Sequence, residues 1–175
     1  MQMRVRVRRT QPIDRLRALP LLRGVGTKEL GRIDRLTDEV DIAEGRVVTR
    51  EGERARGFFL IVSGRALVTV AGRERGVLDT GMFFGEVALA DDSPEPATIS
   101  ALTPMRLRVA SRHEFVQLVV MPPFARALVR TLAAYERLAY DDGVSSHSIT
   151  SGKLARPSDE TASGGCHDRQ VGVHG

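Results

Sequence analysis

The stretch that decides the fold is residues 83–89, FFGEVAL, followed after a short loop by residues 94–99, PEPATI. Gly85 has no side chain, so the backbone can approach a bound molecule closely at this point. A short helical turn beginning at Glu86 would then present free amide N–H groups, which favour an anion. Such a cradle also needs a fixed cation, but the second segment supplies Glu95 and Pro96. The sequence therefore predicts a phosphate cradle without its cation.

From about Leu16 to Tyr140 the chain resembles a cyclic-nucleotide-binding domain. This β-roll sensor module occurs in transcription regulators of the catabolite-activator type, kinase regulatory subunits and gated channels. The family's phosphate-binding cassette reads approximately Phe-Gly-Glu-apolar-Ala-Leu, then Pro-Arg-small-Ala-Thr-apolar. Residues 84–89 match the first part and residues 94 and 97–99 match the second, whereas Glu95 and Pro96 depart from it. Glycines at 45, 52 and 64 and the stretch RLRVASRHEF also agree with the family.

The resemblance implies a role for each cassette residue. In the family an arginine binds the phosphate, a glutamate binds the ribose hydroxyl and helix-borne groups contact the base. Glu86 occupies the position of the ribose carboxylate, and Glu95 occupies that of the arginine. The implied ligands are cyclic AMP and cyclic GMP. The implied ligand-binding residues are Gly85, Glu86, Val87, Ala88, Ala97 and Thr98, and the altered phosphate site is Glu95 with Pro96.

The two substitutions remove most of the affinity expected for an anion. A lost charge-assisted hydrogen bond costs about 1.5–3 kcal/mol. A carboxylate about 4 Å from the phosphate costs about 4 kcal/mol more at an effective dielectric constant near 20. Pro96 also lacks the N–H that a small residue would direct at the phosphate. A total of about 5 kcal/mol or more is three to four decades in affinity, so we predict that cyclic-nucleotide binding is weak or lost.

The sequence leaves three alternatives open for this pocket. In one, Arg65, Arg73 or Arg75 reaches the phosphate from a neighbouring strand or loop. In another, the ligand is a cation or a polar neutral molecule, which Glu86 and Glu95 would accept. In the third, Glu95 is a solvated loop carboxylate in a pocket that has lost its ligand.

The remaining pattern predicts a mainly β fold with flanking helices. Closely spaced strands with glycine-containing turns indicate an antiparallel roll, and the resemblance specifies a β-roll, also called a double-stranded β-helix or jelly roll. A double proline at 122 and 123 separates the last two helices, because proline cannot continue a helix. We expect strands at 40–43, 46–50, 57–64, 65–72, 75–80, 97–103 and 105–110, and helices at 14–25, 27–40, 112–120 and 123–140.

The long last helix carries an apolar seam with heptad-like steps of four and three. In the resembled family this helix covers the ligand and pairs with its mate in a homodimer. The alternative is an amphipathic helix that packs on its own roll, since about two heptads are too few to require a coiled coil. The seam residues are Phe124, Leu128, Leu132, Tyr135 and Ala139.

The charge and composition divide the chain into three parts. Residues 1–17 contain six arginines and one aspartate, a local net charge of +5, so the rest of the +4 chain sums to −1. We expect a basic flexible arm at 1–15, a folded domain at 16–142 and a disordered polar tail at 143–175. The arm is a solvated terminus or a contact for nucleic acid or an anionic surface. The tail lacks the helical patterning of a helix-turn-helix domain, so family-type DNA binding is not expected.

Other classes of function find little support in the sequence. The single cysteine, Cys166, fits a reducing cytoplasm and lies in the tail, away from any nucleophile motif. His113 is the only histidine inside the predicted domain, so a histidine-rich metal site is not expected. No apolar run approaches the 18 residues of a membrane span. We therefore expect that the chain is not an enzyme, holds no metal site and does not span a membrane.

Two functions remain. In the first, the chain is a stand-alone regulatory sensor whose last helix moves on ligand binding and signals to an unknown protein partner. The intact turn at residues 85–89 favours this hypothesis. In the second, it is a ligand-independent dimerisation or interaction scaffold, which the Glu95-Pro96 pair favours.

Overall fold

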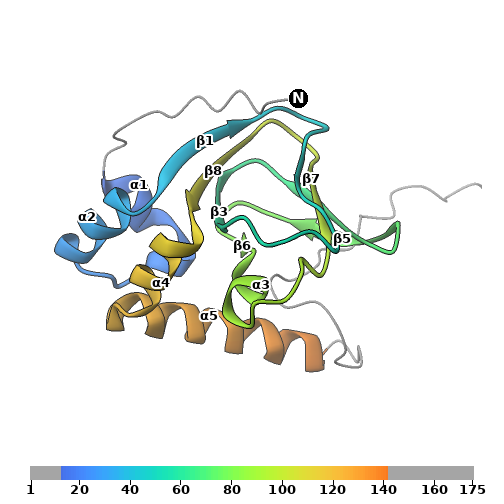
Figure 1. Cartoon of the computed structure of the whole chain (residues 1–175). Coiled ribbons are helices and arrows are strands. Elements are labelled where there is room, and N and C mark those ends of the chain that lie inside the picture. The colour runs from blue at the N-terminus through green and yellow to red at the C-terminus, as the bar shows by residue number, and fades with distance from the viewer. Residues whose placement is uncertain (1–12, 142–175) are drawn as a thin grey trace, which may run out of the picture.

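The computed structural model describes residues 13–141, with side chains through residue 133. In this part of the chain two four-stranded antiparallel sheets face each other and form a β-roll (Figure 1). The first sheet has the order β1 (Asp38–Ile42), β8 (Met105–Ala110), β3 (Phe58–Ser63) and β6 (Phe83–Phe84). The second has the order β2 (Val47–Thr49), β7 (Thr98–Ala101), β4 (Ala66–Val70) and β5 (Arg73–Leu78). This architecture confirms the predicted fold class.

The helices gather along one side of the roll, and α5 runs below the others (Figure 1). No single helix among the described residues is long and apolar enough to cross a membrane; only α4 and the first part of α5 taken together pass that test, and they are bent by 95°. The helical elements are α1 (Ile13–Ala18), η1 (Pro20–Leu22), α2 (Thr27–Arg35), α3 (Glu86–Ala90), α4 (Arg112–Val119) and α5 (Pro122–Asp141).

Three element boundaries differ from the sequence prediction. The helix expected at 14–25 is divided into α1 and η1, because Pro20 has no N–H to continue the hydrogen-bond pattern. The helix expected at 27–40 ends at Arg35, since Asp38–Ile42 pairs instead with β8 along its whole length. The helix α1 begins at Ile13, so the first helical turn includes residues that we had assigned to the basic arm. Residues 1–12 and 142–175, with the rest of the predicted arm and tail, lie outside the described residues.

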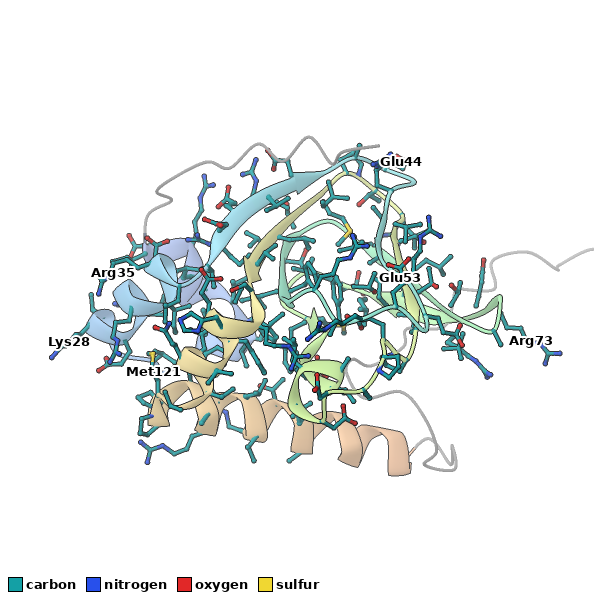
Figure 2. The ribbon with its side chains drawn as sticks, viewed as in Figure 1. Lys28, Arg35, Glu44, Glu53, Arg73 and Met121 are labelled. Carbon is teal, nitrogen blue, oxygen red and sulfur yellow. The ribbon has the colours of Figure 1, made fainter. Side chains whose placement is uncertain are left out.

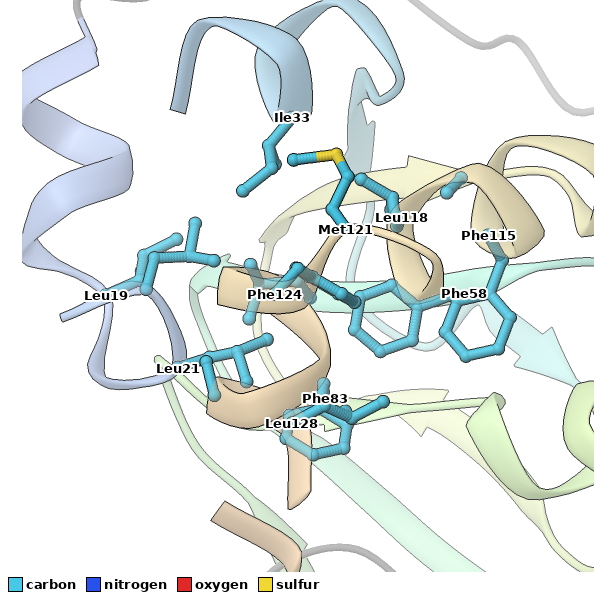
Figure 3. Packing of buried hydrophobic residues seen from close by; sticks show 14 of the residues in the cluster. Leu19, Leu21, Ile33, Phe58, Phe83, Phe115, Leu118, Met121, Phe124 and Leu128 are labelled. Atoms are coloured by element: carbon cyan, nitrogen blue, oxygen red, sulfur yellow. The ribbon is translucent and has the colours of Figure 1, made fainter. Parts of the chain in front are cut away.

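The core has two clusters. One fills the space between the two sheets and includes Ile61, Val68 and Leu107. The other joins the first sheet to the helices, and its centre is Phe58 (Figure 3). The ring of Phe58 lies 5.5, 5.2 and 6.0 Å from the rings of its three partners, which are Phe83, Phe115 and Phe124. Strands β3 and β6 are therefore fixed directly to α4 and α5.

A capping box fixes the start of α4. The Ser111 hydroxyl accepts a hydrogen bond from the Glu114 N–H at 3.4 Å, and the Glu114 carboxylate accepts one from the Ser111 N–H at 2.7 Å. We expect Ser111→Ala to lower the free energy of unfolding by about 1 kcal/mol, because one helix-end donor loses its partner. Urea denaturation measures this effect, and Ser111→Thr, which keeps the hydroxyl, is the control. Equal midpoints for the alanine variant and the unaltered protein would contradict this assignment.

Candidate ligand-binding cassette

The glycine of the cassette is required by both conformation and space. Gly85 follows β6 directly, has a φ of 90° and is the N-cap residue of α3. This left-handed conformation is readily adopted by glycine but is strained for other residues. A Cβ at this position would also overlap the carbonyl oxygen of Gly57. Strand β6 is fixed by stacking of Phe84 on Phe59, whose ring centroids are 4.9 Å apart. The turn is therefore held firmly against β3.

The helix α3 anchors the other end of this turn. The predicted ligand residue Val87 is partly buried, whereas Ala88 and Leu89 are buried in the cluster that joins the sheet to the helices. Through these two side chains, α3 packs against the core that joins the first sheet to the helices. The first half of the predicted cassette thus lies at the interface between the β-roll and the helices.

The second half of the cassette is held by the loop at residues 51–57. The Glu95 N–H donates to the Glu53 carbonyl at 2.8 Å, and the Gly52 N–H donates to the Glu95 carbonyl at 2.9 Å. The Thr98 hydroxyl accepts a hydrogen bond from the Glu51 N–H at 3.0 Å, so this predicted ligand residue already has a protein partner. The same loop ends at Gly57, which lies against Gly85. It therefore brings the two halves of the cassette together. Ala97 is buried and Pro96 is exposed.

The two cassette carboxyls are buried. Glu86 is 4% exposed and Glu95 is 5% exposed. Both carboxyl oxygens of Glu86 and the Oε1 atom of Glu95 are buried without a hydrogen-bond partner. Glu95 is therefore buried and not solvated, which corrects that part of the third alternative. Its backbone is held by hydrogen bonds with residues 52 and 53.

Burial shifts the proton affinity of both groups. Desolvation raises the pKa of Glu86 to about 8; its own backbone amide partly opposes this shift and the nearby Glu95 carboxyl reinforces it. Desolvation also raises the pKa of Glu95 above its ordinary value. The electrostatic influence of Glu95 on Glu86 means that the two carboxyls share one environment. The arrangement repels a phosphate and accepts protons or hydrogen-bond donors.

The three arginines considered as replacements are not brought to this pair. Arg65, Arg73 and Arg75 are all exposed. Arg65 pairs through its carbonyl with Leu102, at the opposite end of β4 from the cassette. Figure 2 shows Arg73 at the outer tip of the β4–β5 hairpin, pointing away from the roll. Within residues 13–133, none of the three makes an ion pair or hydrogen bond with either carboxyl.

One contact of the cassette loop was not predicted. Arg112, the first residue of α4, forms an ion pair of 2.8 Å with Asp92 in the loop between the two halves. Asp92 has a φ of 59°, and the neighbouring Asp91 carboxylate accepts a hydrogen bond from the Ser93 N–H at 3.0 Å. No sequence motif joins positions 92 and 112, since their proximity depends on where β8 ends. This ion pair connects the cassette loop to the C-terminal helices.

The described part of the predicted seam on α5 faces the chain's own core. Phe124 and Leu128 are buried, and Leu132 is partly buried against the same cluster. The alternative of a helix that packs on its own roll therefore holds for these three residues. Tyr135 and Ala139 lie on α5 beyond the described side chains, and the homodimer stays a prediction.

Two facing antiparallel sheets with a glycine-led turn entering a short helix define a β-roll ligand-binding domain. Residues 39–120, which include the whole cassette, match the family model for the cyclic nucleotide-binding domain. This part of the chain belongs to the cyclic nucleotide-binding domain family, as the resemblance implied.

Three relatives illustrate where such a domain occurs. The chain is 38% identical over 108 residues to a cAMP-dependent protein kinase regulatory subunit of Yarrowia lipolytica, covering 59% of this chain and 28% of that protein. It is 36% identical over 121 residues to a cyclic nucleotide-gated potassium channel of Rhizobium etli, covering 69% and 34%. The structure of a cAMP-binding acyltransferase from Mycobacterium smegmatis matches with 33% identity and a TM-score of 0.58, covering 73% and 40%.

The chain spans about a third or less of the length of these two curated relatives. Their names describe a regulatory subunit and a channel, whereas the structural relative is an acyltransferase. The expectation that this chain is not an enzyme therefore stays a prediction.

Proposed function

We propose that this chain is a regulatory sensor module that couples the state of its cassette to the position of α5 and passes that state to a partner protein. The observation that carries this proposal is the shared core of the two elements. Ala88 and Leu89 of α3 belong to the same buried cluster as Phe124, Ala127 and Leu128 of α5. Because packed cores tolerate little change in shape, a shift of α3 on ligand binding would require α5 to repack.

The ion pair between Asp92 and Arg112 supports the same coupling by a second route. Asp92 is exposed and Arg112 is partly exposed. Ion pairs near the surface are worth about 0–1 kcal/mol, so this one guides the position of α4 more than it stabilises the fold. Cassette and helices are thus connected through both apolar packing and charge.

We further propose that the affinity of this module for cyclic nucleotides is weak at neutral pH. The support is the buried Glu95 in the position that the family gives to arginine, since its Oε1 atom has no hydrogen-bond partner among the described residues and the nearby Arg54 is exposed. Pro96 adds to the loss because it has no N–H. Glu86, whose carboxyl is free of protein partners, keeps the ribose-binding position.

Hydrogen exchange tests the coupling in a variant designed to bind. In the Glu95→Arg, Pro96→Ser protein, saturating cyclic AMP should change the exchange rates of amides 124–133 several-fold. The reason is that α5 must repack when α3 moves. The control is the unaltered protein with the same cyclic AMP concentration, which should show no change. If the variant binds cyclic AMP while exchange in α5 stays constant, the proposed signalling route is excluded.

A ligand-independent interaction scaffold is the second candidate, and one surface favours it. A groove of about 380 Å³ lies between the η1–α2 connection and the start of α5. Three arginines, Arg23, Arg126 and Arg130, line it with a single carboxylate, Glu29, so its charge suits an acidic segment of a partner. The homodimer, a nucleic-acid contact of the arm and the cytoplasmic location remain predictions.

A further inference from the structure

The carboxyls of Glu86 and Glu95 are the strongest unexplained feature of the molecule. Buried polar groups in folded proteins nearly always have hydrogen-bond partners, and each exception calls for an explanation. Here three carboxyl oxygens are buried without one. The two residues that carry them are neighbours, since residues 51–57 contact both halves of the cassette and the Glu95 carboxyl acts electrostatically on Glu86. These oxygens are therefore free to accept hydrogen bonds from a partner outside the described residues.

The chemistry of the pair selects the kind of partner. A phosphodiester anion has no donors for these oxygens and is repelled by any negative charge that they carry. A divalent metal ion requires more ligands, and the described residues hold no group of three or more His, Cys, Asp or Glu side chains that would supply them. An ammonium or guanidinium group, in contrast, offers several N–H donors and a positive charge to carboxylates.

We infer that Glu86 and Glu95 together form a binding site for a small organic cation with ammonium or guanidinium N–H donors. This inference rests on the proposed function, because it names the ligand class of the same cassette. Both carboxyls are almost fully buried, so a cation bound there loses its hydration shell and gains two carboxyl acceptors in fixed positions. The site should therefore be selective for cations whose N–H donors match these positions. Where it pairs with Glu95, the loop at residues 51–57 carries two charged side chains, Glu53 and Arg54. Both are exposed, so neither supplies a buried counter-charge to the pair within residues 13–133.

Binding of such a cation would be linked to proton release. Burial holds the Glu86 carboxyl largely protonated at neutral pH, and an ammonium group favours its ionised form. Uptake of the cation should therefore release a proton, and affinity should rise with pH between 6 and 8. A neutral ligand that hydrogen-bonds to the protonated pair would show the opposite pH dependence.

Titration calorimetry of the full chain with putrescine, a linear diamine, tests this inference. We expect saturable binding to the unaltered protein, with a heat that depends on the ionisation enthalpy of the buffer. Glu95→Gln and Glu86→Gln should each weaken binding at least tenfold, because each replaces a carboxylate by a neutral amide. Thermal unfolding of both variants checks that they remain folded. Glu44→Gln, on the exposed turn after β1, is the matched control and should bind as the unaltered protein does.

Three outcomes overturn the inference. They are the absence of binding of both putrescine and adenosine, the binding of adenosine (a neutral probe without phosphate) but not of putrescine, and putrescine binding that Glu95→Gln leaves unchanged. The proposed function is tested separately by the Glu95→Arg, Pro96→Ser protein. If that variant binds cyclic AMP and the hydrogen exchange of its α5 amides changes, while the unaltered protein does not bind putrescine, only the inference of a cation site is wrong. If the variant binds no cyclic AMP either, the sensor proposal fails as well.

Discussion

The Glu95→Arg, Pro96→Ser protein is expected to bind cyclic AMP about three to four decades more tightly than the unaltered protein at pH 7. The arginine replaces a repulsive interaction by a charge-assisted hydrogen bond, and the serine restores a backbone N–H. The sum is about 5 kcal/mol or more at an effective dielectric constant near 20. Titration calorimetry measures both affinities. The scaffold for this gain is already present, since Gly85, Glu86 and the α3 turn keep their cassette positions.

Glu95→Gln, Pro96→Ser is the matched control for this gain. It removes the negative charge and restores the N–H but adds no cation, so it should recover only part of the affinity. If the glutamine protein binds cyclic AMP as tightly as the arginine protein, the missing cation is not the cause of weak binding. If neither variant gains affinity, the pocket is closed for a different reason.

The second large effect is a fall in stability with rising pH that depends on Glu86. Its pKa in the folded protein is about 8, above the ordinary value of 4.5. The folded state therefore holds a proton that the unfolded chain releases, and stability from this group is complete below pH 4.5 and is lost as the pH rises to about 8. Since each tenfold change in proton affinity is worth about 1.4 kcal/mol, the total is about 5 kcal/mol. Neighbouring Glu95 titrates in the same environment and shares in the slope.

Urea denaturation between pH 5 and 9 measures this slope. Glu86→Gln should remove most of it and should be more stable than the unaltered protein above pH 8, because an amide cannot ionise. Glu44→Gln, on an exposed turn, should leave the slope in place. A Glu86→Gln protein with the same pH dependence as the unaltered one would show that this carboxyl is hydrated or paired in solution.

The strands were predictable because they are short, closely spaced segments between glycine-containing turns, and β3, β4 and β8 lie close to the expected positions. The two-residue strand β6 was not predicted, since Phe83 and Phe84 pair with β3 only through contacts distant in sequence. The end of α2 at Arg35 was missed for a similar reason. The apolar pattern continues into β1, and only pairing with β8 makes residues 38–42 a strand.

The composition of the site was predictable, but its burial was not. The cassette motif placed Glu86 and Glu95 in one pocket from sequence. That both are buried depends on the loop at 51–57, which pairs with Glu95 and lies against Gly85. Likewise, the heptad-like spacing of apolar residues on α5 is compatible with packing against either a partner helix or the chain's own core. In the structure Phe124 and Leu128 pack in the chain's own core. Ser111 and Glu114 form a capping box that the sequence contained and our prediction did not use.

The central claim is that Glu95 and Pro96 have replaced the anion site of a cyclic-nucleotide cradle, beside a retained and buried Glu86. The most direct test is a calorimetric titration of cyclic AMP into the unaltered full chain at pH 7. Our account predicts no saturable binding at micromolar concentrations, since a loss of about 5 kcal/mol moves a micromolar dissociation constant to the millimolar range or beyond. A micromolar dissociation constant would contradict it, because some other cation would then have to hold the phosphate beside Glu95.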